Sequence, residues 1–265
     1  MRRNIFSVKN NMLALITVLC VPTAQASAPT PPADWNKQLS ELGVRNEADK
    51  PDYYELPERS DFRVDKSLTF LAGGKRYLLE VYSFHCDSAD FGGMTILAAY
   101  DLGHGKRLVD AVNVQEDREC WLFDRPAVLD LAPGDQAIAV VSAHLNAGED
   151  YNSPALYTLR QGKFVSICDN LPLLYSMRSN GREVTRQARF LSLPPSLKGG
   201  KPTIVLEIVH REKHYQDEAK KPSTSRTEVY RLKLLRQGQR FSIARKDPGL
   251  LKMAATEKRL GINQQ

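Results

Sequence analysis

Three apolar runs, each ending in histidine, decide the fold of this chain: YLLEVYSFH (77–85), QAIAVVSAH (136–144) and TIVLEIVH (203–210). All three have a composition typical of β-strands, and each is shorter than a helix of typical length. A turn rich in Gly or Pro precedes each run, and a further apolar stretch precedes each turn, at 68–71, 127–131 and 188–193. The spacing therefore predicts three copies of a pair of antiparallel strands.

A second repeated motif follows each of the three histidines. A Tyr-x-Leu motif that begins at Tyr100, Tyr157 or Tyr230 leads to a Gly and then to a last β-like run. Gly suits the tight turn between two antiparallel strands. One four-stranded meander cannot bury both of its faces alone. The sequence therefore predicts an all-β fold of three tandem four-stranded antiparallel meanders (about 67–116, 126–170 and 186–246), arranged propeller-like or as stacked sheets; a β-sandwich is the alternative.

The stretch LDLAPGDQ (129–136), a turn that runs into an apolar strand, resembles the blade repeat of FG-GAP/VCBS-type β-propellers. The resemblance covers about residues 67–246 and implies a propeller-like fold. Proteins of that family often carry an Asp-rich, calcium-binding turn at this place. Asp130 and Asp135 match it in one unit, whereas the turns at 70–75 and 194–201 contain no carboxylate. The resemblance therefore does not extend to calcium binding.

Short helices are expected on both sides of the repeats. Trp35, Leu39 and Leu42 recur at helical spacing within 34–44, and a similar apolar stripe follows Pro248 within 247–260. The predicted organisation is a signal peptide at 1–26, an extended linker with a short helix at 27–66, a β-repeat domain at 67–246, and a C-terminal helix and tail at 247–265.

Residues 1–26 have the pattern of a secretory signal. Arg2, Arg3 and Lys9 precede a short apolar run at 12–21, and Ala24 and Ala26 fit the small-residue cleavage pattern. We therefore expect a periplasmic or secreted protein with no membrane span after cleavage. Cleavage lowers the formal net charge from +6 to +3, because three basic residues and no acidic ones leave with the signal. So small a charge argues against nucleic acid as a partner.

Three cysteines remain after the signal: Cys86, Cys120 and Cys168. An oxidising compartment permits one disulfide bond among them. In a four-stranded meander the second and fourth strands end on the same side, which brings Cys86 and Cys120 together, so we expect them to form that bond. Three reduced, buried cysteines are the alternative.

Sequence patterns of common catalytic sites are absent: the chain contains no GxSxG, SxxK, HExxH, GxGxxG or P-loop motif. His85 and Cys86 are neighbours on a predicted strand and would point to opposite faces, which argues against a nucleophile and its base. The sequence therefore favours a protein without catalysis and predicts no cofactor and no metal ion. A hydrolase that uses Asp90 and Asp150 as paired carboxylates is the alternative.

One group of residues repeats in the three units. The loop after each histidine carries an aromatic residue beside acidic or polar ones, and every such loop leaves the same side of a meander array. We expect a binding face there, formed by His85, Asp90, Phe91, His144, Asp150, Tyr151, His210 and Tyr215. The predicted function is to bind an envelope or secreted protein, for instance as an inhibitor or immunity protein; binding of a glycan or peptidoglycan is the alternative.

Overall fold

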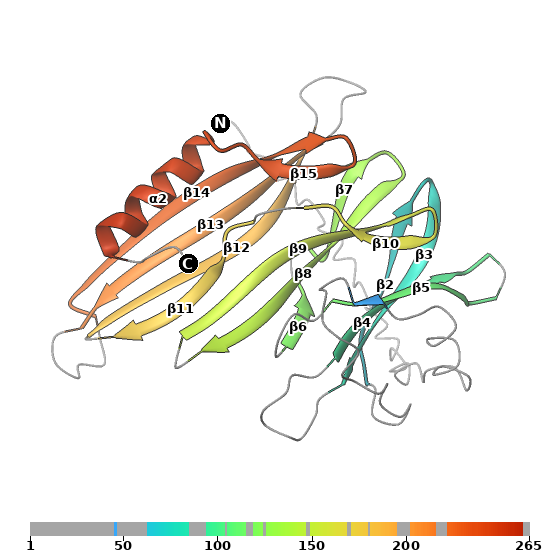
Figure 1. Cartoon of the computed structure of the whole chain (residues 1–265), viewed down its shortest axis with the longest axis horizontal. Coiled ribbons are helices and arrows are strands. Elements are labelled where there is room, and N and C mark those ends of the chain that lie inside the picture. Colours follow the sequence, from blue (N-terminus) through green and yellow to red (C-terminus); the bar gives the residue numbers. More distant parts are fainter. Residues whose placement is uncertain are drawn as a thin grey trace, which may run out of the picture.

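The structure is a computed structural model that describes residues 45–46, 63–84, 94–103, 105–114, 119–123, 126–146, 149–168, 171–179, 181–194, 202–215 and 222–261. Strands make up most of these residues, and α2 (Pro248–Leu260) is the only helix among them (Figure 1). The predicted all-β class and C-terminal helix are therefore confirmed. The helix expected at 34–44 and the expected signal peptide lie outside the described residues.

The first sheet has five strands in the order β1-β5-β4-β3-β2. They are β1 (Arg45–Asn46), β2 (Arg63–Ala72), β3 (Lys75–Phe84), β4 (Met94–Asp101) and β5 (Arg107–Asn113). β2, β3 and β4 each pair antiparallel with the next strand in the chain, and β1 pairs parallel with β5. The loop 85–93, where the sequence places four of its candidate residues, lies outside the described residues.

The second sheet has ten strands in the order β15-β14-β13-β12-β11-β9-β8-β6, with β10 paired to β9 and β7 to β8. They are β6 (Glu119–Leu122), β7 (Val128–Ala132), β8 (Asp135–Asn146), β9 (Glu149–Arg160), β10 (Lys163–Ser166), β11 (Leu174–Ser179), β12 (Arg182–Leu193), β13 (Thr203–His214), β14 (Thr224–Gln237) and β15 (Arg240–Ile243). The sequence did not predict β11, which pairs with both β9 and β12. This strand joins the second and third predicted units in one sheet. Because neither described sheet is closed, a propeller-like arrangement is not confirmed.

The apolar run of β8 is buried on both faces. Ile138 and Val140 belong to a core shared with the five-stranded sheet, whereas Ala139 and Val141 belong to a second core on the other side. Successive residues of a strand point to opposite faces, so an uninterrupted apolar run suits a strand with a core on each side. The run at 136–144 thus places β8 at the centre of the molecule.

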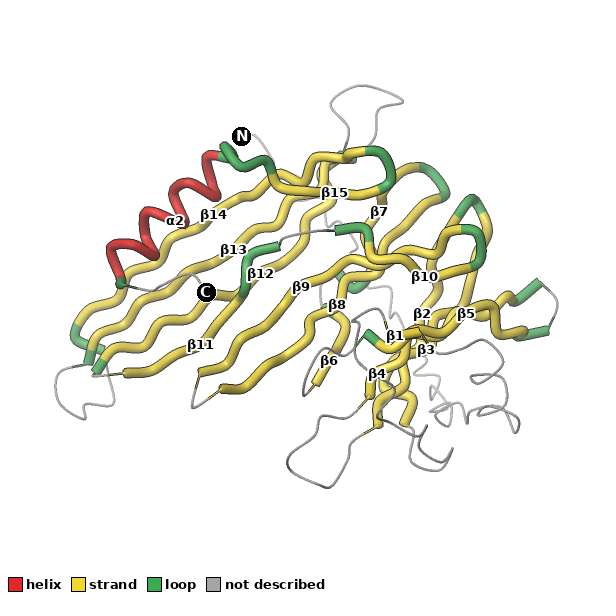
Figure 2. The backbone as a smooth tube through the Cα atoms, in the orientation of Figure 1, coloured by secondary structure: helices red, strands yellow, loops and turns green. Residues whose placement is uncertain are grey.

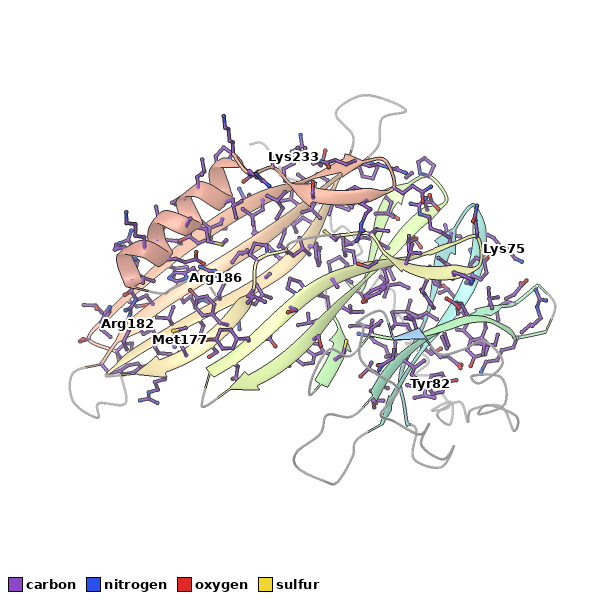
Figure 3. All side chains as sticks on the ribbon, viewed as in Figure 1. Lys75, Tyr82, Met177, Arg182, Arg186 and Lys233 are labelled. Atoms are coloured by element: carbon purple, nitrogen blue, oxygen red, sulfur yellow. The ribbon has the colours of Figure 1, made fainter. Side chains whose placement is uncertain are left out.

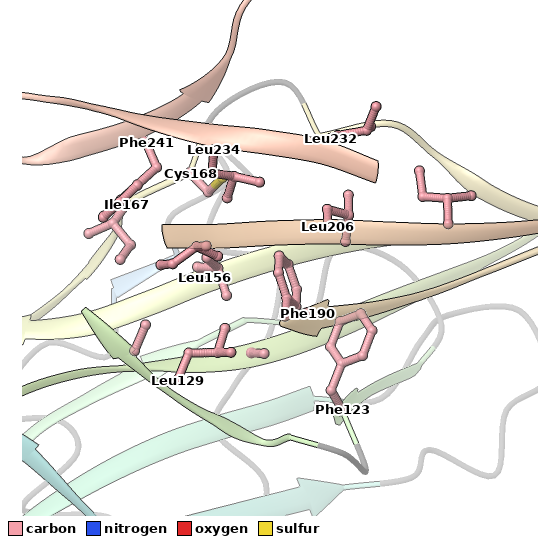
Figure 4. Close-up of a cluster of buried hydrophobic side chains, with 14 of the residues drawn as sticks. Phe123, Leu129, Leu156, Ile167, Cys168, Phe190, Leu206, Leu232, Leu234 and Phe241 are labelled. Atoms are coloured by element: carbon pink, nitrogen blue, oxygen red, sulfur yellow. The ribbon is translucent and has the colours of Figure 1, made fainter. Parts of the chain in front are cut away.

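The second core lies against both halves of the curved ten-stranded sheet (Figure 4). Phe123, directly after β6, packs edge-on against Phe190 of β12, with ring centroids 5.1 Å apart. The hydroxyl of Ser192 also donates to the backbone oxygen of Asp130 on β7, at 3.3 Å. The sheet therefore bends far enough for β12 to meet strands on the far side of β9.

The two sheets also meet at their turns. The amide of Gly74 donates to the backbone oxygen of Gly134 at 2.9 Å, and the amide of Gly73 donates to Oδ1 of Asp135 at 2.8 Å. Gly134 has φ +77°, and a Cβ atom there would lie 3.1 Å from the Cα atom of Gly74. The close approach therefore requires Gly134. Asp135, one of the two carboxylates that match the propeller family, accepts a hydrogen bond from the neighbouring turn.

Helix α2 is defined by its two ends and runs along β14 (Figure 2). The side chain of Asp247 caps it by accepting from the amides of Gly249 and Leu250, and Gly261 ends it in the left-handed conformation. Met253 turns inward to the second core. Thr256 and Glu257 are also buried, so the helix brings polar side chains onto the sheet.

Candidate functional site

A pocket of about 830 Å³ lies where β9 and β12 are no longer bridged by β11. The pairing of β11 with β9 extends only to Asn152, and its pairing with β12 extends only to Thr185. The pocket is lined by Trp121, Phe123, Val141, Asn152, Leu174, Arg186, Gln187 and Ala188. The pocket therefore forms where it does because β11 is short. Residues of five strands and the residue directly after β6 line it.

The wall of the pocket is about half polar and half apolar by surface. Two aromatic and three aliphatic residues line it, together with Asn152, Gln187 and one charged residue, Arg186. Trp121 is 42% exposed and so lies at the pocket's edge. The volume lies within the usual range of sites for small molecules.

Arg186 is the chemically distinctive residue of the wall. It lies on β12, on the side of the sheet that α2 covers, and is 3% exposed (Figure 3). Nη1 donates to Oε1 of Glu257 at 2.6 Å, and the guanidinium carbon lies 4.5 Å from the ring centre of Tyr175. Nε and Nη2 hydrogen-bond to no described residue. A buried cation therefore borders the pocket, and its two unpaired nitrogens are themselves shielded from solvent.

Arg186 belongs to a row of residues that crosses the sheet. The register pairs His144 with Tyr151, Tyr151 with Tyr175, Arg186 with His210, and His210 with Glu228. The contact between Arg186 and Tyr175 joins the two halves of the row. Positions on six strands, from β8 to β14, thus follow one another across the sheet, and we call this line the cross-strand row.

Burial sets the protonation of two groups in this row. His210 is 1% exposed, and neither ring nitrogen hydrogen-bonds to a described residue. Burial and, next, the positive charge of Arg186 lower the pKa of His210, so the ring is neutral at neutral pH. Burial raises the pKa of Tyr175 to about 12, so the hydroxyl keeps its proton. The row therefore holds one buried cation between two neutral rings.

Three residues of the predicted binding face lie in this row: His144, Tyr151 and His210. The expected geometry is nevertheless wrong for His210, because β13 continues to His214 and His210 lies inside the strand. Tyr151 lies within β9, not in a loop above a rim. For His144 the structure gives a strand position opposite Tyr151. The predicted binding face therefore stays a prediction, and the strands continue past the ends that the repeat predicted for them.

Among the described residues, none of the predicted binding residues lines the pocket, and Asp150 and Tyr215 also lie outside the cross-strand row. Asp150 is exposed on β9, opposite Ser176. Tyr215 follows β13 and donates its hydroxyl to Oε2 of Glu183 at 2.8 Å, with Arg178 over its ring. It is therefore held against the sheet. The remaining predicted residues, His85, Cys86, Asp90 and Phe91, lie outside the described residues.

Cys120 and Cys168 are both buried, in different cores. Cys86 lies outside the described residues, so its bond to Cys120 stays a prediction. One contact supports it: the hydroxyl of Thr95 donates to the backbone oxygen of Cys120 at 3.3 Å, and Thr95 pairs with Ser83, three residues before Cys86.

The described residues offer no arrangement typical of catalysis or of metal binding. Among them, no three His, Cys, Asp or Glu side chains are grouped so that they could hold a metal ion. The hydrolase alternative needs Asp90, which lies outside this part of the chain. The pocket provides polar and apolar surface in similar amounts and one charged residue, Arg186.

The comparisons with known proteins found no match: no family model, no curated protein and no solved structure is similar to this chain. The resemblance to propeller repeats therefore stays a prediction. In the part of the chain that the structure describes, no helix is both long and apolar enough to cross a membrane.

The sequence analysis missed most of the pocket. Trp121 and Leu174 lie on strands that it did not predict. Arg186 had a detectable signal, because Val184, Arg186, Ala188 and Phe190 alternate along one face of β12, and a charged residue in such a series is placed toward the core. A charged residue at a core-facing position needs a hydrogen-bonding or charged partner. Catalytic sequence motifs do not reveal such a partner.

Proposed function

We propose that this protein is an exported, non-catalytic binding protein that takes a small, largely apolar molecule into the pocket between β9 and β12. The volume of the pocket and its five apolar lining residues carry this proposal. Apolar side chains bind by removing apolar surface from water, and the polar half of the lining offers hydrogen bonds to the rest of a ligand. The expected signal peptide at 1–26 supports a periplasmic or secreted location.

The first test is binding of N-phenyl-1-naphthylamine, an uncharged apolar dye whose fluorescence rises in an apolar site. We expect saturable binding with one site per chain. Ala188→Phe fills the pocket from β12 and is expected to weaken dye binding by about tenfold or more, because burying the dye there would force overpacking.

Val229→Phe is the matched control, since Val229 is an exposed residue on β14 outside the pocket wall. This variant is expected to bind the dye like the wild type. Thermal unfolding of both variants shows whether the fold is kept. Unsaturable binding by the wild type, or equal binding by a folded Ala188→Phe variant, would contradict the proposal.

A protein partner, as expected from the sequence, is the second candidate. Trp121 and Leu173 are large, exposed apolar side chains, and Trp121 and Leu174 line the pocket. A partner that inserts an apolar side chain between them would use the same site. Capture of a stoichiometric partner that competes with the dye would favour this candidate; a partner bound without competition would place the interface elsewhere.

A further inference from the structure

We propose that two copies of this chain associate through β14, whose free edge pairs antiparallel with the same edge of a second copy. The pairing continues the ten-stranded sheet across a two-fold axis, with Thr227 of each copy on the axis. This inference is independent of the pocket and of its ligand. It is carried by a stretch of β14 that has no strand on one side among the described residues, and by the charges along that stretch.

β14 is an edge strand over most of its length (Figure 1). β13 pairs with one side of it from Thr224 to Leu234, whereas β15 pairs with the other side only from Leu234 to Gln237. In the described part of the chain, no strand lies against that second side from Thr224 to Lys233. A strand edge with free N–H and C=O groups is a template for pairing with another strand.

Helix α2 covers only one end of this edge. The amide of Lys233 donates to Oδ2 of Asp247 at 3.3 Å. Gly249 lies so close to the backbone oxygen of Arg231 that a Cβ atom on it would be 2.7 Å away. The other end of α2 lies over β12 and β13 instead. The edge from Thr224 to Tyr230 is therefore left uncovered by the helix, and Thr227 is its midpoint.

The backbone of this stretch presents the groups that antiparallel pairing needs. The N–H of Lys233 and the C=O of Arg231 point out of the sheet toward α2. Because the direction of these groups alternates along a strand, Ser225, Thr227 and Val229 also present theirs at the free edge. With Thr227 on the axis, Ser225 lies opposite Val229 of the second copy. Each such pair exchanges both of its N–H···O=C hydrogen bonds.

Charge selects this register over its neighbours. Arg226 lies opposite Glu228 of the second copy, in a pair without backbone hydrogen bonds, where side chains come closest. Within one chain, Nη2 of Arg226 lies 2.8 Å from Oε1 of Glu228, so the dimer joins two ion pairs. Moving the axis by one residue would set Arg226 against Arg226, or Glu228 against Glu228. Like charges directly opposite each other are destabilising.

Analytical ultracentrifugation of the full mature chain, together with hydrogen exchange, tests the association. A short edge interface is weak, so we expect a reversible monomer–dimer equilibrium between about 1 and about 300 µM. The amides of 224–230 should exchange more slowly as the dimer forms. A monomer at all concentrations, or a dimer that leaves this segment unprotected, would overturn the inference. Protection that does not depend on concentration would indicate pairing within one chain and would also overturn it.

Thr227→Pro removes the N–H group on the axis. Proline is tolerated on an edge strand where the N–H faces away from the neighbouring strand, so we expect the fold to be kept. Dimerisation should weaken by about tenfold or more, because the central backbone pair is lost. Thr227→Val keeps the N–H and the strand propensity, so this control should dimerise like the wild type. Unchanged dimerisation by a folded Thr227→Pro variant contradicts the proposal.

Arg226→Glu changes the charge and keeps every backbone group. It sets a carboxylate opposite Glu228 of the second copy, so we expect dimerisation to weaken by about tenfold or more at low salt. Salt at about 1 M should restore much of it by screening, whereas Thr227→Pro should stay monomeric. Arg236→Glu is the control, since Arg236 lies on β14 where β15 already covers the edge. If Arg226→Glu dimerises as well as Arg236→Glu at low salt, the inference is wrong.

Discussion

Arg186 and His210 occupy paired positions on β12 and β13, and both are buried polar residues with unused hydrogen-bonding groups among the described residues. Natural proteins rarely keep such groups in a core. The two differ in what they can do about it. His210 avoids the cost of a buried charge by losing its proton, whereas Arg186 must stay charged. His210 therefore makes the stability depend on pH, whereas Arg186 remains a buried charge at neutral pH.

The state of His210 predicts a pH dependence of stability. Its pKa is lowered in the folded protein, so below about pH 6.5 the unfolded chain takes up a proton that the folded chain refuses. Stability should fall as the pH drops through this range and level off below the folded-state pKa. His210→Phe should remove this part of the dependence, which for one proton is at most about 1.4 kcal/mol per pH unit.

Urea unfolding at pH 7.5, 6.5 and 5.5 measures this difference. Lowered carboxyl pKa values, such as those of Glu207 and Glu212, act at more acidic pH and are shared by both proteins. At neutral pH, His210→Phe should be at least as stable as the wild type, because it removes two buried nitrogens without partners. An unchanged slope between pH 7.5 and 5.5 would show that His210 is not the group that titrates.

At the scale of elements, α2 places Glu257 against Arg186 and therefore belongs to the candidate site. Its start depends on Asp247, which accepts hydrogen bonds from Gly249 and Leu250 and also, at 3.3 Å, from the amide of Lys233 on β14. One side chain thus ends the loop, begins the helix and ties it to the sheet. The apolar stripe at 247–260 predicted the helix, but not the polar face that it buries.

Loss of this cap is expected to weaken the whole fold. Asp247→Ala should lower the free energy of unfolding by about 1–2 kcal/mol, because it leaves backbone amides without their acceptor. Asp247→Asn keeps a capping oxygen and should retain most of the stability. Chemical denaturation of the three proteins makes the comparison. Equal losses in the two variants would point to the negative charge of Asp247 instead of its hydrogen bonds.

At the scale of the molecule, the two sheets are joined by a shared core along β8 and by the contact of two turns. The turns at Gly74 and Gly134 occupy corresponding places in the first and second predicted units. Units that pack turn to turn need a residue without a side chain at the contact. The short β11 then leaves the opening between β9 and β12 in which the pocket forms.

A pair of glycine substitutions tests the contact between the turns. Gly134→Ala and Gly238→Ala both place a side chain at positive φ, which costs about 1 kcal/mol. Only at Gly134 does the new Cβ meet another backbone; at Gly238 nothing lies within 4 Å. We expect Gly134→Ala to cost at least about 1 kcal/mol more in urea unfolding. Equal costs would mean that the turns separate without loss.

The sequence by itself determined the local structure of this protein. The described residues of the three repeats, 77–84, 136–144 and 203–210, all fall in strands, and Tyr100, Tyr157 and Tyr230 lie on the strands that follow them. Alternation of side chains, turn residues and strand length act over short distances along the chain, so they can be read from a sequence.

Only the tertiary structure decided how the strands combine. The pairing of β11 with both β9 and β12, the bend that brings Phe190 to Phe123, and the meeting of Arg186 with Glu257 join residues far apart in the chain. Each of these contacts requires the closing of a long loop and the packing of one sheet face against another. Local sequence patterns do not specify either of these. For the same reason the strand positions of Tyr151 and His210 and the pocket lined by Arg186 emerged only from the fold.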